Sequence, residues 1–163
     1  MDPTCPACGR RLSEHDRHVR FTLPDPVLDR DVREDADGVW MSHADARGSV
    51  FLSVDGIGSF VRALLPVRLT GGYSVTFGVW VGVAHEEMLR AHDVWFAQSY
   101  SGLVLEGYLA NKVAPWSVLG APVRLEVRNP DETPYCVSSP DSELSGVLGN
   151  TWDHEPVLAA LPT

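Results

Sequence analysis

The stretch that decides the fold is YSVTFGVWVGVAHEEMLRAHDVWFAQ, residues 73–98. Residues 73–83 alternate between large apolar side chains and mostly small or polar ones, which is the period of a β-strand with one buried face. From residue 85 the apolar side chains recur every three or four positions, as on one face of an α-helix. Glu86 and Glu87 fall in its first turn, where negative charge favours the helix dipole. We predict a strand over 73–83 and an amphipathic helix over 85–98 packed on the sheet.

The same alternation predicts two strands upstream, over 49–55 and 61–69. Asp55-Gly56 and Gly71-Gly72 separate these runs, at positions where hairpin turns need residues that tolerate positive φ. Because the connections are too short for crossover helices, we expect antiparallel pairing.

Two more strands are predicted downstream, over 103–109 and 123–127. Asp153 is expected to cap a final helix that runs to Leu161, with Pro156 in its first turn. The predicted fold class is α+β: an antiparallel sheet of about five to six strands, one main amphipathic helix, a C-terminal helix and an N-terminal cysteine knuckle.

The length and composition suit one domain over residues 1–163, with the knuckle in 1–20 and the α+β core in 39–163. Residues 24–38 are rich in Pro and Asp and are expected to form a surface loop with one short helical turn. No apolar run approaches the roughly 20 residues of a membrane helix, and the N-terminus lacks a signal-peptide pattern. We therefore expect a cytoplasmic protein.

The formal net charge is −9, from 22 acidic and 13 basic side chains. This acidity provides solubility, and it also suits contact with a basic protein partner. Nucleic-acid binding is disfavoured because it needs a basic surface. The one arginine-rich segment, residues 10–20, contains Glu14 and Asp16 and follows Asp2, which nearly cancel its charge.

The strongest chemical motif is Cys5-Pro6-Ala7-Cys8-Gly9, because two thiolates separated by two residues can bind one Zn²⁺. His15 and His18 are the nearest residues that could complete a four-ligand set. Such a site would be structural, since it leaves no open position for water. The alternatives are a reduced pair that binds nothing and a redox pair, but the pair precedes every predicted strand and so lacks the βαβ setting of a redox motif. Cys136 is expected to be a buried apolar residue.

No catalytic set stands out elsewhere. His85-Glu86-Glu87 lacks the second histidine of a metalloprotease helix, because position 89 is Leu89. Trp80 lies on the otherwise small and polar face of its strand, where it could pack or line a pocket. An enzyme with a pocket near Trp80, Tyr108, Asn111 and His92 remains the alternative function.

Four segments occur in an order that resembles a bacterial family called domain of unknown function 2199. They are CPACG, FGVWVGVAHEEMLRAHDVW, GYLANKVAPW and SPDSELSGVLGNTW. The resemblance covers nearly the whole chain and implies a compact, zinc-binding α+β domain without an assigned activity. The family typically has a histidine soon after its CxxCG knuckle, where this chain has Leu12 and then His15. We expect a small binding or regulatory module with a structural zinc knuckle.

Overall fold

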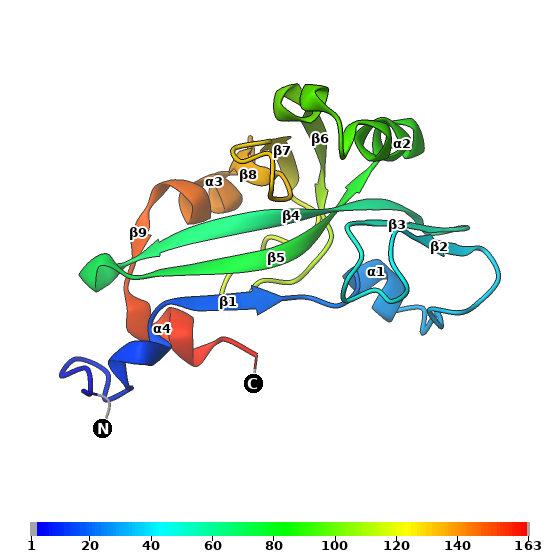
Figure 1. Cartoon of the computed structure of the whole chain (residues 1–163). Helices are drawn as coiled ribbons and strands as arrows, with labels where there is room; N and C mark the ends of the chain where they lie inside the picture. The colour runs from blue at the N-terminus through cyan, green and yellow to red at the C-terminus, as the bar shows by residue number, and fades with distance from the viewer. Residues whose placement is uncertain (1–2, 163) are drawn as a thin grey trace.

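The computed structural model describes residues 3–162 (Figure 1). Its strands are β1 (Arg17–Arg20), β2 (Val39–Met41), β3 (Phe51–Val54), β4 (Gly58–Leu69), β5 (Ser74–Val83), β6 (Val104–Leu109), β7 (Pro122–Glu126), β8 (Tyr135–Ser138) and β9 (Thr151–Trp152). Its α-helices are α1 (Asp25–Leu28), α2 (His85–Val94), α3 (Ser142–Gly149) and α4 (His154–Ala159). Three 3-10 turns, η1 (Leu12–Glu14), η2 (Thr70–Gly72) and η3 (Gln98–Gly102), connect them. Within the described residues, no helix is long and apolar enough to cross a membrane.

The long antiparallel hairpin β4–β5 is the central element of the fold, as Figure 1 shows. Strands β6, β7 and β8 continue from β5, and β8 returns to pair with β4, so that five strands close into a barrel. The outer strands β1, β2, β3 and β9 extend this barrel. The fold is therefore α+β, with a mixed five-stranded barrel, outer strands and two main helices, α2 and α3.

The predicted hairpin and main helix are confirmed, but the predicted antiparallel sheet of five to six strands is too simple. The described part of the chain forms nine strands, and three of the pairings are parallel: β1 with β5, β4 with β8 and β4 with β9. Parallel partners come from distant parts of the sequence, which is why short connections between neighbouring strands did not reveal them. Helix α2 also ends at Val94 rather than near residue 98.

The core lies on both faces of the hairpin. The face with Leu65 and Phe77 packs against α2, β6 and β7 in the main cluster. The opposite face was expected to be small and polar, yet Trp80 is fully buried there with Leu52 and Phe60 in a second cluster. The prediction of one buried face is therefore wrong for the middle of β4 and β5, because α1 and β3 supply apolar partners.

The two ends of the described chain lie at the same end of the hairpin. Figure 1 shows the N-terminal segment and α4 together, beside the turn that joins β4 to β5. Strand β9 brings this about by pairing with the end of β4, where Leu69 is opposite Trp152. Asp153 then caps α4, as predicted, by accepting a hydrogen bond from the backbone N–H of Glu155. This arrangement positions the candidate site.

Candidate metal centre

Residues 4–11 form a compact knuckle around the two cysteines. A bridge joins Thr4 to Arg11, and the N–H of Cys5 donates to the Arg10 carbonyl at 2.7 Å. The chain turns back after the second cysteine because Gly9 adopts a φ of 76°, which other residues rarely tolerate. Its N–H donates to the carbonyl of Cys5 at 2.8 Å. The knuckle thus points both thiols to one side.

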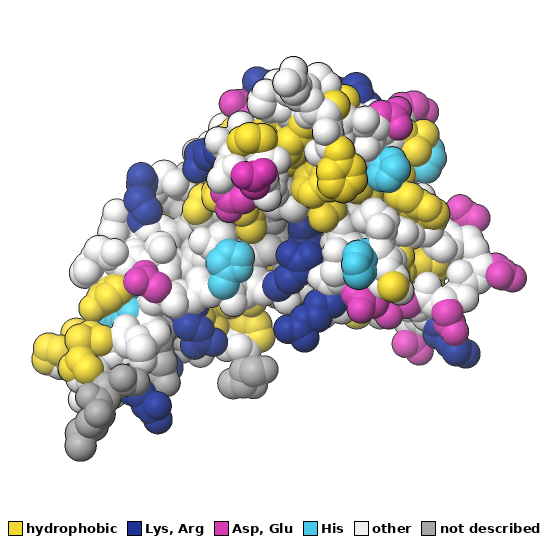
Figure 2. Space-filling view, viewed as in Figure 1, with side chains coloured by type: hydrophobic (Ala, Val, Ile, Leu, Met, Phe, Trp, Pro, Cys, Tyr) yellow, Lys and Arg dark blue, Asp and Glu magenta, His cyan; other side chains and the backbone are white. Residues whose placement is uncertain are grey.

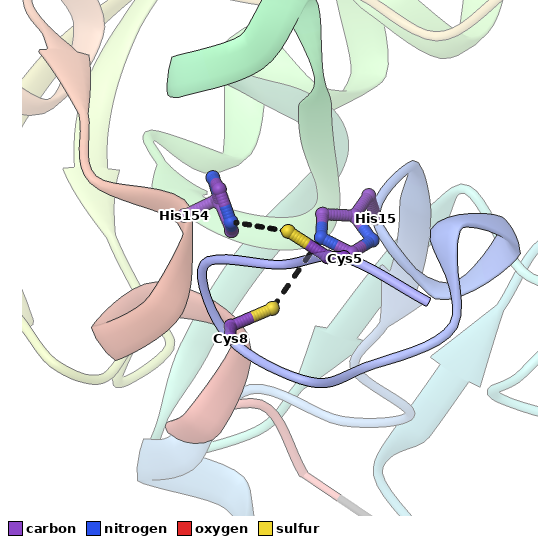
Figure 3. A group of neighbouring side chains, drawn as sticks. All are labelled: Cys5, Cys8, His15 and His154. Carbon is purple, nitrogen blue, oxygen red and sulfur yellow. Dashed lines mark hydrogen bonds between the residues drawn. The ribbon is translucent and has the colours of Figure 1, made fainter. Parts of the chain in front are cut away.

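Four potential metal ligands converge at this point: Cys5, Cys8, His15 and His154 (Figure 3). Their ligand atoms all lie within 4.8 Å of one another. Cys5, His15 and His154 are buried, and Cys8 is half-buried. We call this group the Cys2His2 cluster. It joins the knuckle to the first residue of α4.

Two sulfur–nitrogen separations in the cluster match those around a tetrahedral zinc ion. The Sγ of Cys5 lies 3.5 Å from the Nε2 of His154, and the Sγ of Cys8 lies 3.5 Å from the Nε2 of His15. Zinc bonds of about 2.3 Å to sulfur and about 2.0–2.1 Å to nitrogen, at tetrahedral angles, give a sulfur–nitrogen separation of about 3.5 Å. The Cys2His2 cluster could therefore hold a metal such as zinc.

Both histidines are held with Nε2 directed at the cluster. The Nδ1 of His15 lies 3.0 Å from the carbonyl oxygen of Arg11. The Nδ1 of His154 lies 3.3 Å from the carbonyl oxygen of Thr70 and 2.9 Å from its hydroxyl. A carbonyl can only accept, so these contacts favour the proton on Nδ1 and leave a lone pair on Nε2. Such outer contacts are characteristic of histidines that bind metals.

Electrostatics at the cluster favour a thiolate. Backbone N–H groups of Ala7 and Cys8, together with His154 and His15, lower the pKa of Cys5 to about 6, although burial opposes this. Metals bind the thiolate form of cysteine. Cys136 behaves oppositely, because its full burial raises its pKa to about 12. It is the small buried residue that the sequence predicted.

Three of the four predicted ligands lie in the cluster, and the fourth does not. His18 is in β1 with an exposed side chain, outside the group that converges. His154, which the sequence analysis missed, takes part instead. It is 149 residues from Cys5, so no local spacing could indicate it. The only signal was its place at the start of the helix that Asp153 caps.

The residues of the alternative enzyme site have structural contacts. Asn111 is fully buried, and its amide accepts from the backbone N–H of Trp80 and donates to the carbonyl of Leu23. Trp80 is a packing residue whose indole N–H donates to the carbonyl of Thr22. Tyr108 is 63% exposed and borders an open surface pocket.

The fourth of these residues, His92, lies apart on α2. Its ring makes edge contacts with Trp40 and Phe51. The four residues therefore do not converge on one deep pocket.

The fold and the cluster together define a small α+β protein with a candidate Cys2His2 metal centre. The chain belongs to the family described as uncharacterized protein conserved in bacteria (DUF2199), which it matches over residues 4–145. That range contains Cys5, Cys8 and His15, whereas His154 lies beyond it. No curated protein and no solved structure matches the chain.

Proposed function

We propose that the protein is a binding or regulatory module in which Cys5, Cys8, His15 and His154 bind one structural zinc ion. The observation that carries this proposal is the convergence of four ligand atoms within 4.8 Å from opposite ends of the chain. Zinc is the metal that best suits two thiolates and two imidazoles in a tetrahedral arrangement. Reduced thiolates also suit the cytoplasm, where disulfides are rare.

The role is structural because the protein supplies all four ligands. A catalytic zinc site keeps a position open for water or substrate, and this cluster has none to spare. The segment that the metal would hold has few apolar side chains of its own: from residue 3 to 13, only Cys5 is buried. Metal binding can supply folding free energy where hydrophobic burial cannot.

The proposal is tested by the metal content of protein purified without a histidine tag. We expect about one zinc per chain in the wild type and loss of that zinc in His154→Ala and His15→Ala. His18→Ala is the matched control, because it removes an exposed histidine of the same segment and should keep its zinc. Replacement by Co²⁺ should give the absorption of a tetrahedral thiolate site. Wild-type protein without metal, or equal loss in the control, would contradict the proposal.

We also propose a basic protein partner. The support is the net charge of −9 and an exposed surface at α2. There Leu89 is 45% and Phe96 97% exposed, close to the acidic residues Glu86 and Asp93. The upper right of Figure 2, where Figure 1 places α2, displays hydrophobic and acidic side chains together. A partner for this surface should bind less tightly to Phe96→Ser and to protein in high salt.

A further inference from the structure

A buried arginine lies at the centre of the molecule. Arg62 of β4 is completely buried, and its guanidinium carbon lies 4.0 Å from the centre of the Trp80 ring. Its N–H groups donate to backbone carbonyls only, those of Phe21, Ala46, Ser49 and Gly78. Among the described side chains, no carboxylate forms an ion pair with it. The carbonyl dipoles hydrogen-bond this cation but do not neutralise its charge.

Two more arginines lie beside it at the surface. The Nε of Arg20, at the end of β1, donates to the carbonyl oxygen of Arg47 at 2.7 Å. The stem of Arg20 lies against Gly78, where an added Cβ would be 3.4 Å from its Cγ. The side chains of Arg20 and Arg47 are exposed. The terminal N–H groups of Arg20 and the whole Arg47 guanidinium have no hydrogen-bond partner among the described residues.

The charge of Arg20 acts unfavourably on that of Arg62, and the charge of Arg47 on that of Arg20. Burial, and then the charge of Arg20, lower the pKa of Arg62 to about 9. Burial and the nearby Arg47 lower the pKa of Arg20 in turn. The charged forms of Arg62 and Arg20 therefore lack stabilisation that an anion would provide.

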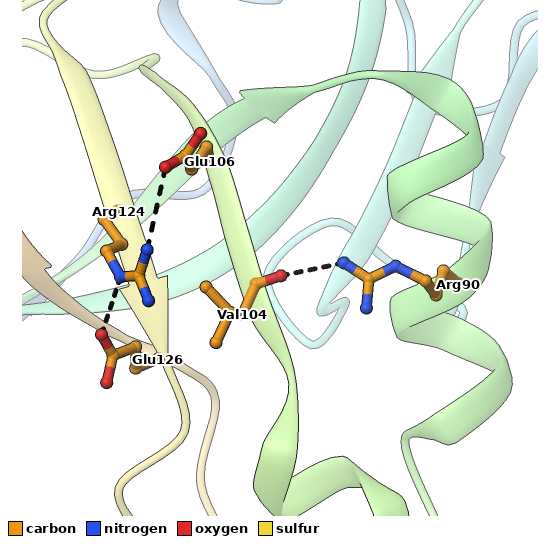
Figure 4. Close-up of polar contacts among 5 residues, drawn as sticks. All are labelled: Arg90, Val104, Glu106, Arg124 and Glu126. Carbon is orange, nitrogen blue, oxygen red and sulfur yellow. Dashed lines mark hydrogen bonds and ion pairs between the residues drawn. The ribbon is translucent and has the colours of Figure 1, made fainter.

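Three arginines elsewhere in the described chain, Arg33, Arg90 and Arg124, form ion pairs with carboxylates. Arg124 lies between Glu106 and Glu126, with Nε 2.8 Å from the carboxylate of Glu126 (Figure 4). Arg90 donates to the carboxylate of Glu87, and Figure 4 shows its second bond, to the Val104 carbonyl.

Two acidic residues contact the backbone on either side of Arg47. Glu34 and Asp45 accept from the backbone N–H groups of Ala46 and Gly48. The chain has 22 acidic residues, yet among the described residues no carboxylate forms an ion pair with any of these three neighbouring arginines. An anionic ligand would supply the missing negative charge.

We propose that Arg20 and Arg47, with Arg62 beneath them, bind the phosphate group of a small-molecule ligand. Free guanidinium N–H groups match phosphate oxygens in a bidentate manner, and they are the donors that this surface offers. Figure 2 shows Lys and Arg side chains gathered in the middle of this face, near the tip of β1 in Figure 1. Arg62 contributes its positive charge from the buried side. Its hydrogen bonds to the carbonyls of Phe21 and Ala46 hold the backbone next to Arg20 and Arg47. This site is separate from the Cys2His2 cluster.

The test is a calorimetric titration of the full-length protein, as purified, with inorganic phosphate and pyrophosphate at constant ionic strength. We expect saturable binding that weakens at least tenfold in the double variant Arg20→Gln/Arg47→Gln. The matched control is Arg17→Gln/Arg30→Gln, which removes the same charge from two exposed arginines outside the site and should change the Kd less than twofold. Arg20→Lys/Arg47→Lys keeps the charge but loses the planar fork, so it should bind with intermediate affinity.

Three results would overturn the proposal. One is the absence of saturable binding to the wild type, and another is equal weakening in the Gln variant and its control. The third concerns the source of the phosphate group: a short single-stranded oligonucleotide that binds in place of pyrophosphate would show a polymer site instead of a small-molecule site. Circular dichroism of each variant establishes that it is folded before its titration is interpreted.

Discussion

The barrel and the Cys2His2 cluster lie along the same β4–β5 hairpin, yet different forces hold them. The barrel buries Leu65 and Phe77 almost completely, together with apolar side chains from α2, β6 and β7. The knuckle has little apolar surface to bury, and its two thiols meet the imidazoles of His15 and His154 instead. Hydrophobic burial does not depend on a cofactor, whereas a cluster of metal ligands does. The two regions should therefore respond separately to perturbation.

The largest effect is expected from the barrel. Phe77→Ala should lower the free energy of unfolding by about 3–5 kcal/mol, because it leaves a cavity in the main core. Urea denaturation measures this change, and Leu28→Ala, at a site 56% exposed, is the control that should stay near the wild type. A loss below about 1 kcal/mol would show that the barrel tolerates the cavity by collapsing around it.

Removal of the metal should act on the knuckle alone. With free zinc at about 100 times its Kd, binding stabilises the closed knuckle by about 2.7 kcal/mol. Chelation should thus speed hydrogen exchange of the Cys5 and Gly9 amides by up to roughly 100-fold and leave the amides of β4 and β5 unchanged. Equal acceleration in both regions would mean that knuckle and barrel open as one unit, which would abolish the distinction between them.

A smaller effect is expected from the residue that orients His154. Thr70→Val removes the hydroxyl that lies 2.9 Å from the His154 Nδ1 and that also accepts from its backbone N–H. Zinc affinity should fall roughly 10–100-fold, because contacts of this type orient the metal ligand. Competition with a chelator measures the affinity, and Thr76→Val, a half-buried threonine of β5, is the matched control. An unchanged affinity would show that the Thr70 carbonyl suffices.

The smallest effect is expected at the surface of α2. Phe96 is 97% exposed, so Phe96→Ser should change the free energy of unfolding by less than about 0.5 kcal/mol. Phe51→Ser is its counterpart in the core, where the side chain is 2% exposed and its loss should be severe. Thermal unfolding compares the two variants. Marked destabilisation by Phe96→Ser would mean that this aromatic side chain supports the fold instead of a partner.

The strands and helices that follow a simple period could be predicted from the sequence. Alternation placed β4, β5 and the face that carries Phe77, and the helical period placed α2. Helix α3 was missed, although Asp141 caps it by accepting from the N–H of Leu144 at 2.9 Å. The short closing pairing between Leu64 and Tyr135 was also beyond reach, because one pair leaves no pattern in either strand.

The two candidate sites were predictable to different degrees. The spacing of Cys5 and Cys8 predicts a metal-binding pair, and His15 is close to them in the sequence. His154 reaches the cluster because β9 pairs with the end of β4. This is a contact between distant parts of the chain, which local sequence patterns do not reveal. The buried Arg62 contradicts the expectation that the second face of its strand is polar and exposed. Its partners are backbone carbonyls, and these carry no sequence signal.

The bridge between Cys5 and His154 has a mechanical consequence. With a metal in place, these residues are joined across 149 positions of the chain, so a force applied at residues 3 and 162 bypasses almost everything between them. The metal–ligand bonds would bear the load, and about 500 Å of extendable chain would stay hidden until they rupture. Stretched as a single molecule, the zinc-loaded protein should extend in one late step, whereas the chelated protein should yield at the barrel strands directly.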